Sequence, residues 1–128
     1  MELPAIVTLI AIVEYMVFSF RVGLSREKYG VKAPATSGNE EWERLFRVQQ
    51  NTLEQLIIFL PALWIFSHYV SPMFGAGIGC IFLVGRPIYA AAYARDPSAR
   101  GLGFLMGYLT SVVLLLGSAG GIIYSLVF

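Results

Sequence analysis

Three polar side chains with complementary chemistry stand at helical spacing in the first half of the sequence. Arg47, Asn51 and Glu54 occupy positions i, i+4 and i+7, so a helix places them on one face. This face carries a cation, a neutral amide and an anion just before the apolar run 56–60. Ionisable groups that enter a membrane usually face the protein interior or a wet cavity. The stripe therefore indicates either the solvated start of a membrane-crossing helix or a ligand site.

A second polar stripe lies in a later apolar segment. Arg86, Tyr89 and Tyr93 stand at i, i+3 and i+7 and share a helix face. One interpretation is an arginine that extends to the membrane surface beside two interfacial tyrosines. Interfacial tyrosines do not need to align with a buried cation, however. The alignment therefore favours a second wall of a ligand site.

The composition predicts the elements that position these stripes. Of the 128 residues, 57% are hydrophobic and 13% are charged, and the mean hydropathy is +0.70, whereas soluble domains carry about 25% charged residues. We predict an all-α membrane protein in which residues 1–128 form a single domain, a four-helix transmembrane bundle with spans at about 3–23, 42–67, 75–94 and 102–127. The net charge of +1 gives no support for nucleic-acid binding. A lone cysteine, Cys80, excludes an internal disulfide, and no metal site is predicted.

The distribution of charge predicts orientation. All nine Lys and Arg residues lie in or beside the connections 24–41 and 95–100, or in the helix halves that lead into them. The positive-inside rule then places both connections in the cytoplasm, with both polar stripes and the loop cations Arg26 and Arg100 at the same end. Glu14, in the middle of the first span, needs a partner on a neighbouring helix or marks a small transporter subunit. The glycine pair Gly103/Gly107 indicates close helix packing.

The collected groups suggest the chemistry of a ligand. Arginines bind carboxylates through two hydrogen bonds, Glu54 would pair with an ammonium group, and Asn51 and Gln49 could bond peptide amides. An arginine beside a thiol lowers the thiol pKa by favouring the thiolate. The expected ligand is a small zwitterion with more carboxylates than amines. Glutathione fits this description, as do other peptides and anionic metabolites.

The same residues resemble the signature of a known family. The run Glu43-x-x-x-Arg47-x-Gln49-x-Asn51-x-x-Glu54, and the later run Arg86-x-x-Tyr89-x-x-x-Tyr93-x-Arg95 with Arg100, resemble the MAPEG family of membrane-associated proteins in eicosanoid and glutathione metabolism. The resemblance covers nearly the whole chain. It implies a homotrimer of four-helix protomers that bind glutathione between neighbouring subunits at the cytosolic side.

The resemblance also implies residue roles and a reaction. It assigns Arg100 to stabilising the thiolate, and it assigns Arg26 and Gln49 to a site shared with the adjacent subunit. The reaction would be glutathione attack on an apolar electrophile, with reduction of lipid hydroperoxides as a second activity. The remaining glutathione-contacting positions that it implies are Arg47, Asn51, Glu54, Arg86, Tyr89 and Tyr93.

Three departures from the family's eicosanoid-forming members favour a generic glutathione transferase of the short prokaryotic kind, in a bacterial inner membrane. Gln55 and Phe104 replace tyrosines, and Glu27 replaces an arginine beside Arg26. The alternative function, from a different class, is a non-catalytic membrane protein of the same fold that binds and presents lipids. The complete set of polar groups favours the enzyme, because a lipid-presenting scaffold does not need it.

Overall fold

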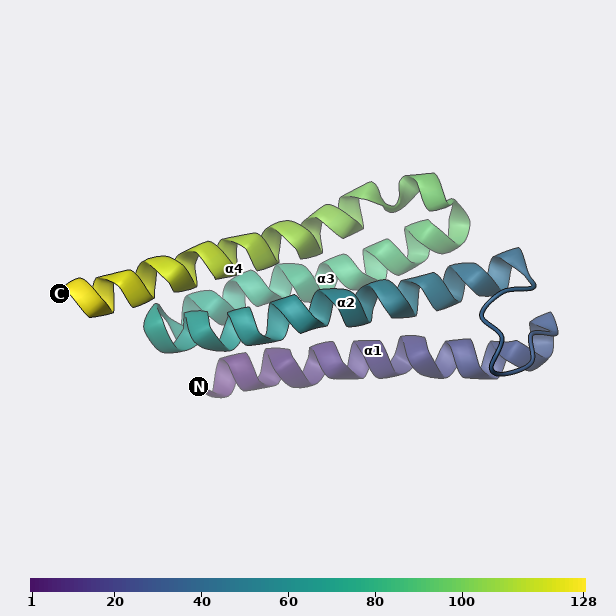
Figure 1. Ribbon diagram of the computed structural model, residues 1–128, viewed down its shortest axis with the longest axis horizontal. Helices are drawn as coiled ribbons and strands as arrows, with labels where there is room; N and C mark the ends of the chain where they lie inside the picture. Colours follow the sequence, from purple (N-terminus) through teal and green to yellow (C-terminus); the bar gives the residue numbers. More distant parts are fainter.

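A computed structural model describes all 128 residues as an elongated bundle of helices. The helices are α1 (Glu2–Tyr29), α2 (Glu40–Tyr69), α3 (Pro72–Arg95) and α4 (Gly101–Val127), with the short 3₁₀ helix η1 (Pro97–Arg100) before α4. Successive helices run in opposite directions, so the α1–α2 and α3–α4 connections meet at one end and both termini lie toward the other (Figure 1). The predicted all-helical, four-helix architecture is confirmed.

The helix ends follow local sequence signals. Gly30 ends α1 in the left-handed conformation, with φ at 70°, and its N–H bonds back to the last turn. Asn39 caps α2 by accepting a hydrogen bond from the Trp42 N–H at 2.9 Å. Helix α1 therefore continues two turns beyond the end predicted near residue 23. That prediction used the bilayer thickness, which does not limit a helix outside the membrane.

The other two connections are also capped. Ser71 caps α3 by accepting from the Phe74 N–H, and Pro72 occupies the first turn. Asp96 follows α3 and caps η1 through the Ser98 N–H. Because Pro97 cannot continue a helix, α3 ends before it and the chain turns within four residues into α4.

Three helices are long and apolar enough to cross a membrane: α1, α3 and the η1–α4 segment. Helix α2 is polar over its first half and is not among these three, but it packs against all of them. Its apolar half supplies the centre of the core, where the rings of Phe59 and Phe82 stack with centroids 3.9 Å apart. Many large apolar side chains on the outer surface remain exposed, as expected of helices that face lipid.

Glycine permits a close contact between α3 and α4. A Cβ atom on Gly103 of α4 would lie 2.5 Å from the backbone nitrogen of Tyr89 on α3. The predicted close packing at the Gly103/Gly107 spacing is confirmed at Gly103. This contact brings the start of α4, and with it Arg100, against the Tyr89 turn of α3.

Candidate functional site

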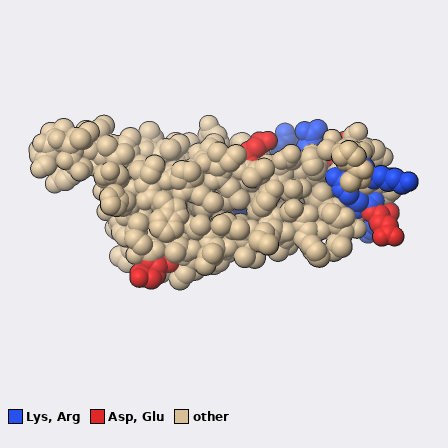
Figure 2. Space-filling view, turned by 60° about the horizontal axis from the view of Figure 1, so that its bottom comes forward, with Lys and Arg blue, Asp and Glu red and all other residues tan.

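The two predicted stripes face a common polar pocket near the end of the bundle that holds the α1–α2 and α3–α4 connections. The pocket has a volume of about 280 Å³ and is lined by Arg47, Gln50, Asn51, Glu54, Tyr89, Tyr93 and Arg100. Helix α2 forms one wall, α3 the second, and η1 closes the end. Lys and Arg side chains gather over this end of the molecule (Figure 2). Helical spacing places the polar residues of each wall on one face of its helix. The antiparallel packing of α2 on α3 then brings the two faces together.

Arg86 lies beneath the pocket floor. It is fully buried, and both of its terminal nitrogens donate to the Asn51 Oδ1 at 2.9 Å. Its guanidinium also lies 4.4 Å from the centre of the Tyr89 ring, in the geometry of a cation–π contact. Arg86 does not line the pocket itself. Its contacts instead fix the orientation of two residues that do.

The buried Arg86 forms no ion pair. No carboxylate, including that of Glu14 on α1, lies within 4 Å of its nitrogens. The Glu14 Oε1 is buried without a hydrogen-bond partner. The partner on a neighbouring helix that was expected for Glu14 therefore stays a prediction.

Arg100 reaches the pocket from the turn between α3 and α4. Its Nη1 donates to the carbonyl oxygen of Pro97 at 2.6 Å, and its guanidinium lies 6.0 Å from the centre of the Tyr93 ring. The Asp96 carboxylate holds this turn by accepting from the Ser98 N–H at 3.0 Å and from the Ser98 hydroxyl at 2.8 Å. These two hydrogen bonds hold the pKa of Asp96 below its ordinary value.

Besides Arg86, two further predicted site residues lie outside this pocket. The guanidinium of Arg26 stacks 4.6 Å from the Trp42 ring centre and donates to the Ala35 carbonyl at 2.8 Å. Gln49 donates to the hydroxyl of Tyr15 on α1 at 3.4 Å. Both residues therefore connect α1, its following loop and α2, and neither lines the pocket.

Gln50 is a pocket residue that was not predicted from the sequence. It lines the pocket, three residues after Arg47 and four before Glu54. This spacing places it on the same helix face. The signal was therefore present in the sequence, although Gln50 was not assigned to the polar stripe.

The pocket combines two cationic groups, one carboxylate, two amides and two phenols. The guanidinium groups of Arg47 and Arg100 can each hold an anionic group, while the Glu54 carboxylate can accept hydrogen bonds from an ammonium group. No group of three or more His, Cys, Asp or Glu residues could hold a metal ion. The site therefore suits a small organic zwitterion with excess negative charge.

Comparison with known proteins agrees with the fold and with the predicted resemblance to the MAPEG family. The model of the MAPEG family matches residues 4–120. An uncharacterized protein of Synechocystis sp. is 46% identical over 123 residues, which cover 96% of this chain and 90% of that protein.

Two mammalian relatives have names that state an activity. Microsomal glutathione S-transferase 2 of Homo sapiens is 34% identical over 119 residues, which cover 92% of this chain and 81% of the human protein. Leukotriene C4 synthase of Mus musculus is 36% identical over 98 residues, which cover 77% of this chain and 65% of the mouse protein. The matched region in each case exceeds three quarters of this chain.

Proposed function

Because this chain belongs to the MAPEG family, we propose that it is an integral membrane glutathione transferase that conjugates glutathione to apolar electrophiles. One observation carries the proposal: Arg47, Asn51, Glu54, Tyr89, Tyr93 and Arg100 converge on a single polar pocket. The relatives named as a glutathione S-transferase and a leukotriene synthase support a transferase-type activity in general. A second proposed reaction is the reduction of lipid hydroperoxides, in which two glutathione molecules are oxidised to their disulfide and the hydroperoxide is reduced to an alcohol and water.

The chemistry of the pocket suggests how the tripeptide binds. Arg47, which is exposed on the α2 wall, offers two parallel donors to a glutathione carboxylate. Glu54, about two turns further along the same helix face, accepts from the α-ammonium group. The Oδ1 of Asn51 is occupied by Arg86, so the amide nitrogen is what Asn51 offers to a peptide carbonyl. Holding the tripeptide at these points orients its cysteine toward the end of the pocket that η1 closes, where Arg100 lies.

Arg100 is the candidate catalytic residue. A guanidinium beside the cysteine sulfur favours the thiolate and lowers the pKa of the bound thiol, so the proton leaves to solvent before attack. The thiolate sulfur then donates an electron pair to form a bond with the electrophilic carbon. The leaving group departs with its bonding electrons, or a conjugated acceptor takes up the electron pair and a proton. The adjacent lipid phase supplies an apolar electrophile.

The assembly and orientation are part of the proposal. Arg26 and Gln49 lie away from the pocket of their own protomer, which fits residues that complete the site of an adjacent subunit in a homotrimer. The basic end of the bundle faces the cytoplasm by the positive-inside rule. This orientation, in a bacterial inner membrane, would open the pocket to cytoplasmic glutathione.

The test is a titration of the detergent-purified protein with glutathione, followed by thiolate absorbance in the near ultraviolet. The wild-type protein should give a saturable thiolate signal. Arg100→Leu should lose most of the signal, and Arg47→Ala should require more glutathione to reach it. Arg95→Leu is the matched control, because Arg95 is an exposed cation near the same turn that does not line the pocket.

One outcome would contradict the proposed enzyme, and another would contradict the role of Arg100. No binding at millimolar glutathione would contradict the proposal and favour the lipid-presenting scaffold. Equal loss of the thiolate in Arg95→Leu and Arg100→Leu would contradict the assignment of Arg100. Conjugation of a chromogenic aryl halide by the wild-type protein, monitored in parallel, separates binding from turnover.

A further inference from the structure

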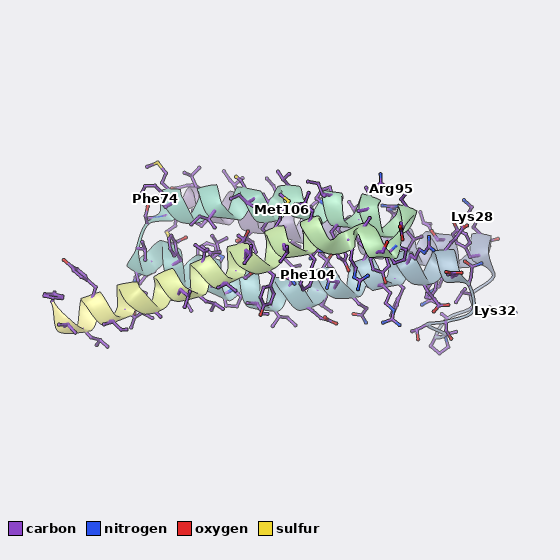
Figure 3. All side chains as sticks on the ribbon, turned by 90° about the horizontal axis from the view of Figure 1, so that it is seen from above. Lys28, Lys32, Phe74, Arg95, Phe104 and Met106 are labelled. Atoms are coloured by element: carbon purple, nitrogen blue, oxygen red, sulfur yellow. The ribbon has the colours of Figure 1, made fainter.

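A second basic hollow lies between the ends of α1, α2 and α3, and the proposed function does not use it. Its volume is about 410 Å³, and its lining includes the cations Arg21, Lys28 and Arg44. We call it the interfacial basic pocket. It shares no lining residue with the polar pocket described above. Lys28 lies at the same end of the bundle as Arg95, opposite Phe74 (Figure 3).

The charges of this pocket are incompletely paired. Arg21 and Lys28 are exposed and form no ion pair, while Arg44 pairs with Glu40 at 3.4 Å and donates to the Ala94 carbonyl at 3.3 Å. The Nε of Arg44 is buried without a hydrogen-bond partner. Glu41 is the single carboxylate in the lining. Because Glu40 pairs with Arg44, the cations Arg21 and Lys28 against the carboxylate of Glu41 leave the pocket with an excess of positive charge.

The pocket lies where a membrane surface would cross the bundle. Residues 3–20 of α1 carry one charged side chain, Glu14, and at 1.5 Å per residue they extend about 27 Å, close to the thickness of a bilayer hydrocarbon core. Arg21 is the next residue. A cation at this position, with Lys28 two turns further along, is at the depth of lipid headgroups.

An apolar surface continues from the pocket toward the bilayer centre. Val13 and Val17 precede Arg21 by eight and four residues, so they lie on the same face of α1. Both are exposed, with 55% and 49% of their surface accessible. A molecule bound at Arg21 could therefore place an apolar chain along this face. This combination of a cationic site and an adjoining apolar strip fits an anionic amphiphile better than a soluble anion.

We propose that the interfacial basic pocket binds the phosphate group of an anionic phospholipid, with an acyl chain lying along Val13 and Val17. Arg21 and Lys28 hold the phosphate, and the guanidinium group of Arg44 adds positive charge at the inner wall. Basic pockets between helices at a membrane surface have the properties needed to bind such headgroups. A headgroup with hydroxyl groups, such as glycerol, can also donate to Glu41.

The experiment measures the thermal unfolding midpoint of the detergent-purified full chain during titration with dioleoylphosphatidylglycerol. The lipid should raise the midpoint saturably in the wild-type protein. The double variant Arg21→Gln/Lys28→Gln should weaken the apparent lipid affinity at least about tenfold, since each cation near a membrane surface contributes substantially to anionic lipid binding. Both side chains are exposed, so the midpoint without lipid should match that of the wild-type protein.

The matched control is Lys32→Gln/Arg95→Gln. It removes the same charge from exposed residues at the same end of the bundle that do not line the pocket (Figure 3). This variant should keep the wild-type response to lipid. Equal weakening in the two double variants would overturn the site and indicate general attraction between charges.

Two further arms identify the ligand. Dioleoylphosphatidylcholine should produce a much smaller shift, because its choline cation opposes the basic pocket. An equal shift would overturn the requirement for an anionic lipid. Inorganic phosphate at millimolar concentration should produce little shift, and a response equal to that of phosphatidylglycerol would overturn the lipid as the source of the phosphate.

Discussion

Arg86 directs both terminal nitrogens of its guanidinium to one oxygen atom, the Oδ1 of Asn51, at 2.9 Å each. Arg86 is fully buried, so this oxygen is the acceptor that offsets most of the cost of removing the guanidinium from water. The pairing also fixes which end of the Asn51 amide is available to a ligand. One buried contact between α2 and α3 thus affects both stability and binding.

Replacing Asn51 should separate these two effects. Asn51→Leu leaves the buried Arg86 without an acceptor, so we expect the free energy of unfolding to fall by about 2–4 kcal/mol. Asn51→Asp keeps an acceptor for Arg86 but loses the amide donor. It should retain near wild-type stability while weakening glutathione binding about 3- to 10-fold, the value of one hydrogen bond.

Denaturant unfolding and a glutathione titration of both Asn51 variants provide the check. Equal stability of Asn51→Leu and the wild-type protein would contradict the role of Asn51 as the acceptor for Arg86. Wild-type glutathione affinity in Asn51→Asp would contradict the amide as a ligand donor.

Gly103→Ala tests the contact between α3 and α4. The added Cβ would lie within 2.7 Å of the Tyr89 backbone nitrogen and of its Cα and Cβ atoms. The helices must then move apart, and we expect a loss of about 1–3 kcal/mol in the free energy of unfolding. Because Tyr89 lines the polar pocket, the KM for glutathione should rise as well.

The matched control is Gly77→Ala, within α3. No atom lies within 4 Å of a Cβ at Gly77, and the residue is helical. Alanine there should raise the free energy of unfolding by about 0.5–1 kcal/mol through helix propensity alone. The stabilities of the two variants are compared by thermal or denaturant unfolding in the same detergent. A loss of stability in Gly77→Ala as well would contradict the assignment of the Gly103→Ala effect to the contact with Tyr89.

Much of the candidate site was predictable because its walls are faces of single helices. Arg47, Asn51 and Glu54 are brought together by helical period alone, and so are Tyr89 and Tyr93. The burial of Arg86 beneath Asn51 was not predictable, because it depends on how α3 is rotated against α2. The predicted role of Arg26 in the site of an adjacent subunit stays a prediction. Its packing on Trp42 was not predictable, because it depends on how the connection between α1 and α2 folds.

Glu54→Gln tests recognition of the ligand ammonium group. Glu54 is exposed on the pocket wall, so the substitution should leave folding intact. Loss of a charge-assisted hydrogen bond should raise the KM for glutathione about 10- to 100-fold, with a smaller change in kcat. Glu27→Gln is the matched control, because it removes the same charge from an exposed residue outside the pocket.

An N-acetylated glutathione sharpens this measurement. It lacks the ammonium group, so it should bind the wild-type protein as weakly as glutathione binds Glu54→Gln. Acetylation should then cost little further affinity in the variant. Full additivity of the two changes would show that Glu54 does not pair with the ammonium group.

The Asp96 carboxylate should make the stability of the protein depend on pH through the turn that carries Arg100. Its pKa is held below the ordinary value by the Ser98 N–H and hydroxyl, so its stabilisation is present above the unfolded-state pKa of about 3.9. The stabilisation is lost as the pH falls from there through the lower pKa of the folded state. At pH 6, Asp96→Ala should therefore unfold at a lower temperature than the wild-type protein, and the difference should shrink on acidification below pH 4.

Asp96→Asn is the control for charge, since its side-chain oxygen can still accept from the Ser98 N–H while it does not titrate. Its difference from Asp96→Ala should persist at low pH. At neutral pH, loosening of the turn in Asp96→Ala should also reduce the glutathione thiolate signal, because Arg100 is the last residue of η1. A wild-type thiolate signal in Asp96→Ala would show that Arg100 reaches the sulfur without the Asp96 cap. A signal that is reduced in Asp96→Ala and restored in Asp96→Asn would link the cap to the placement of Arg100.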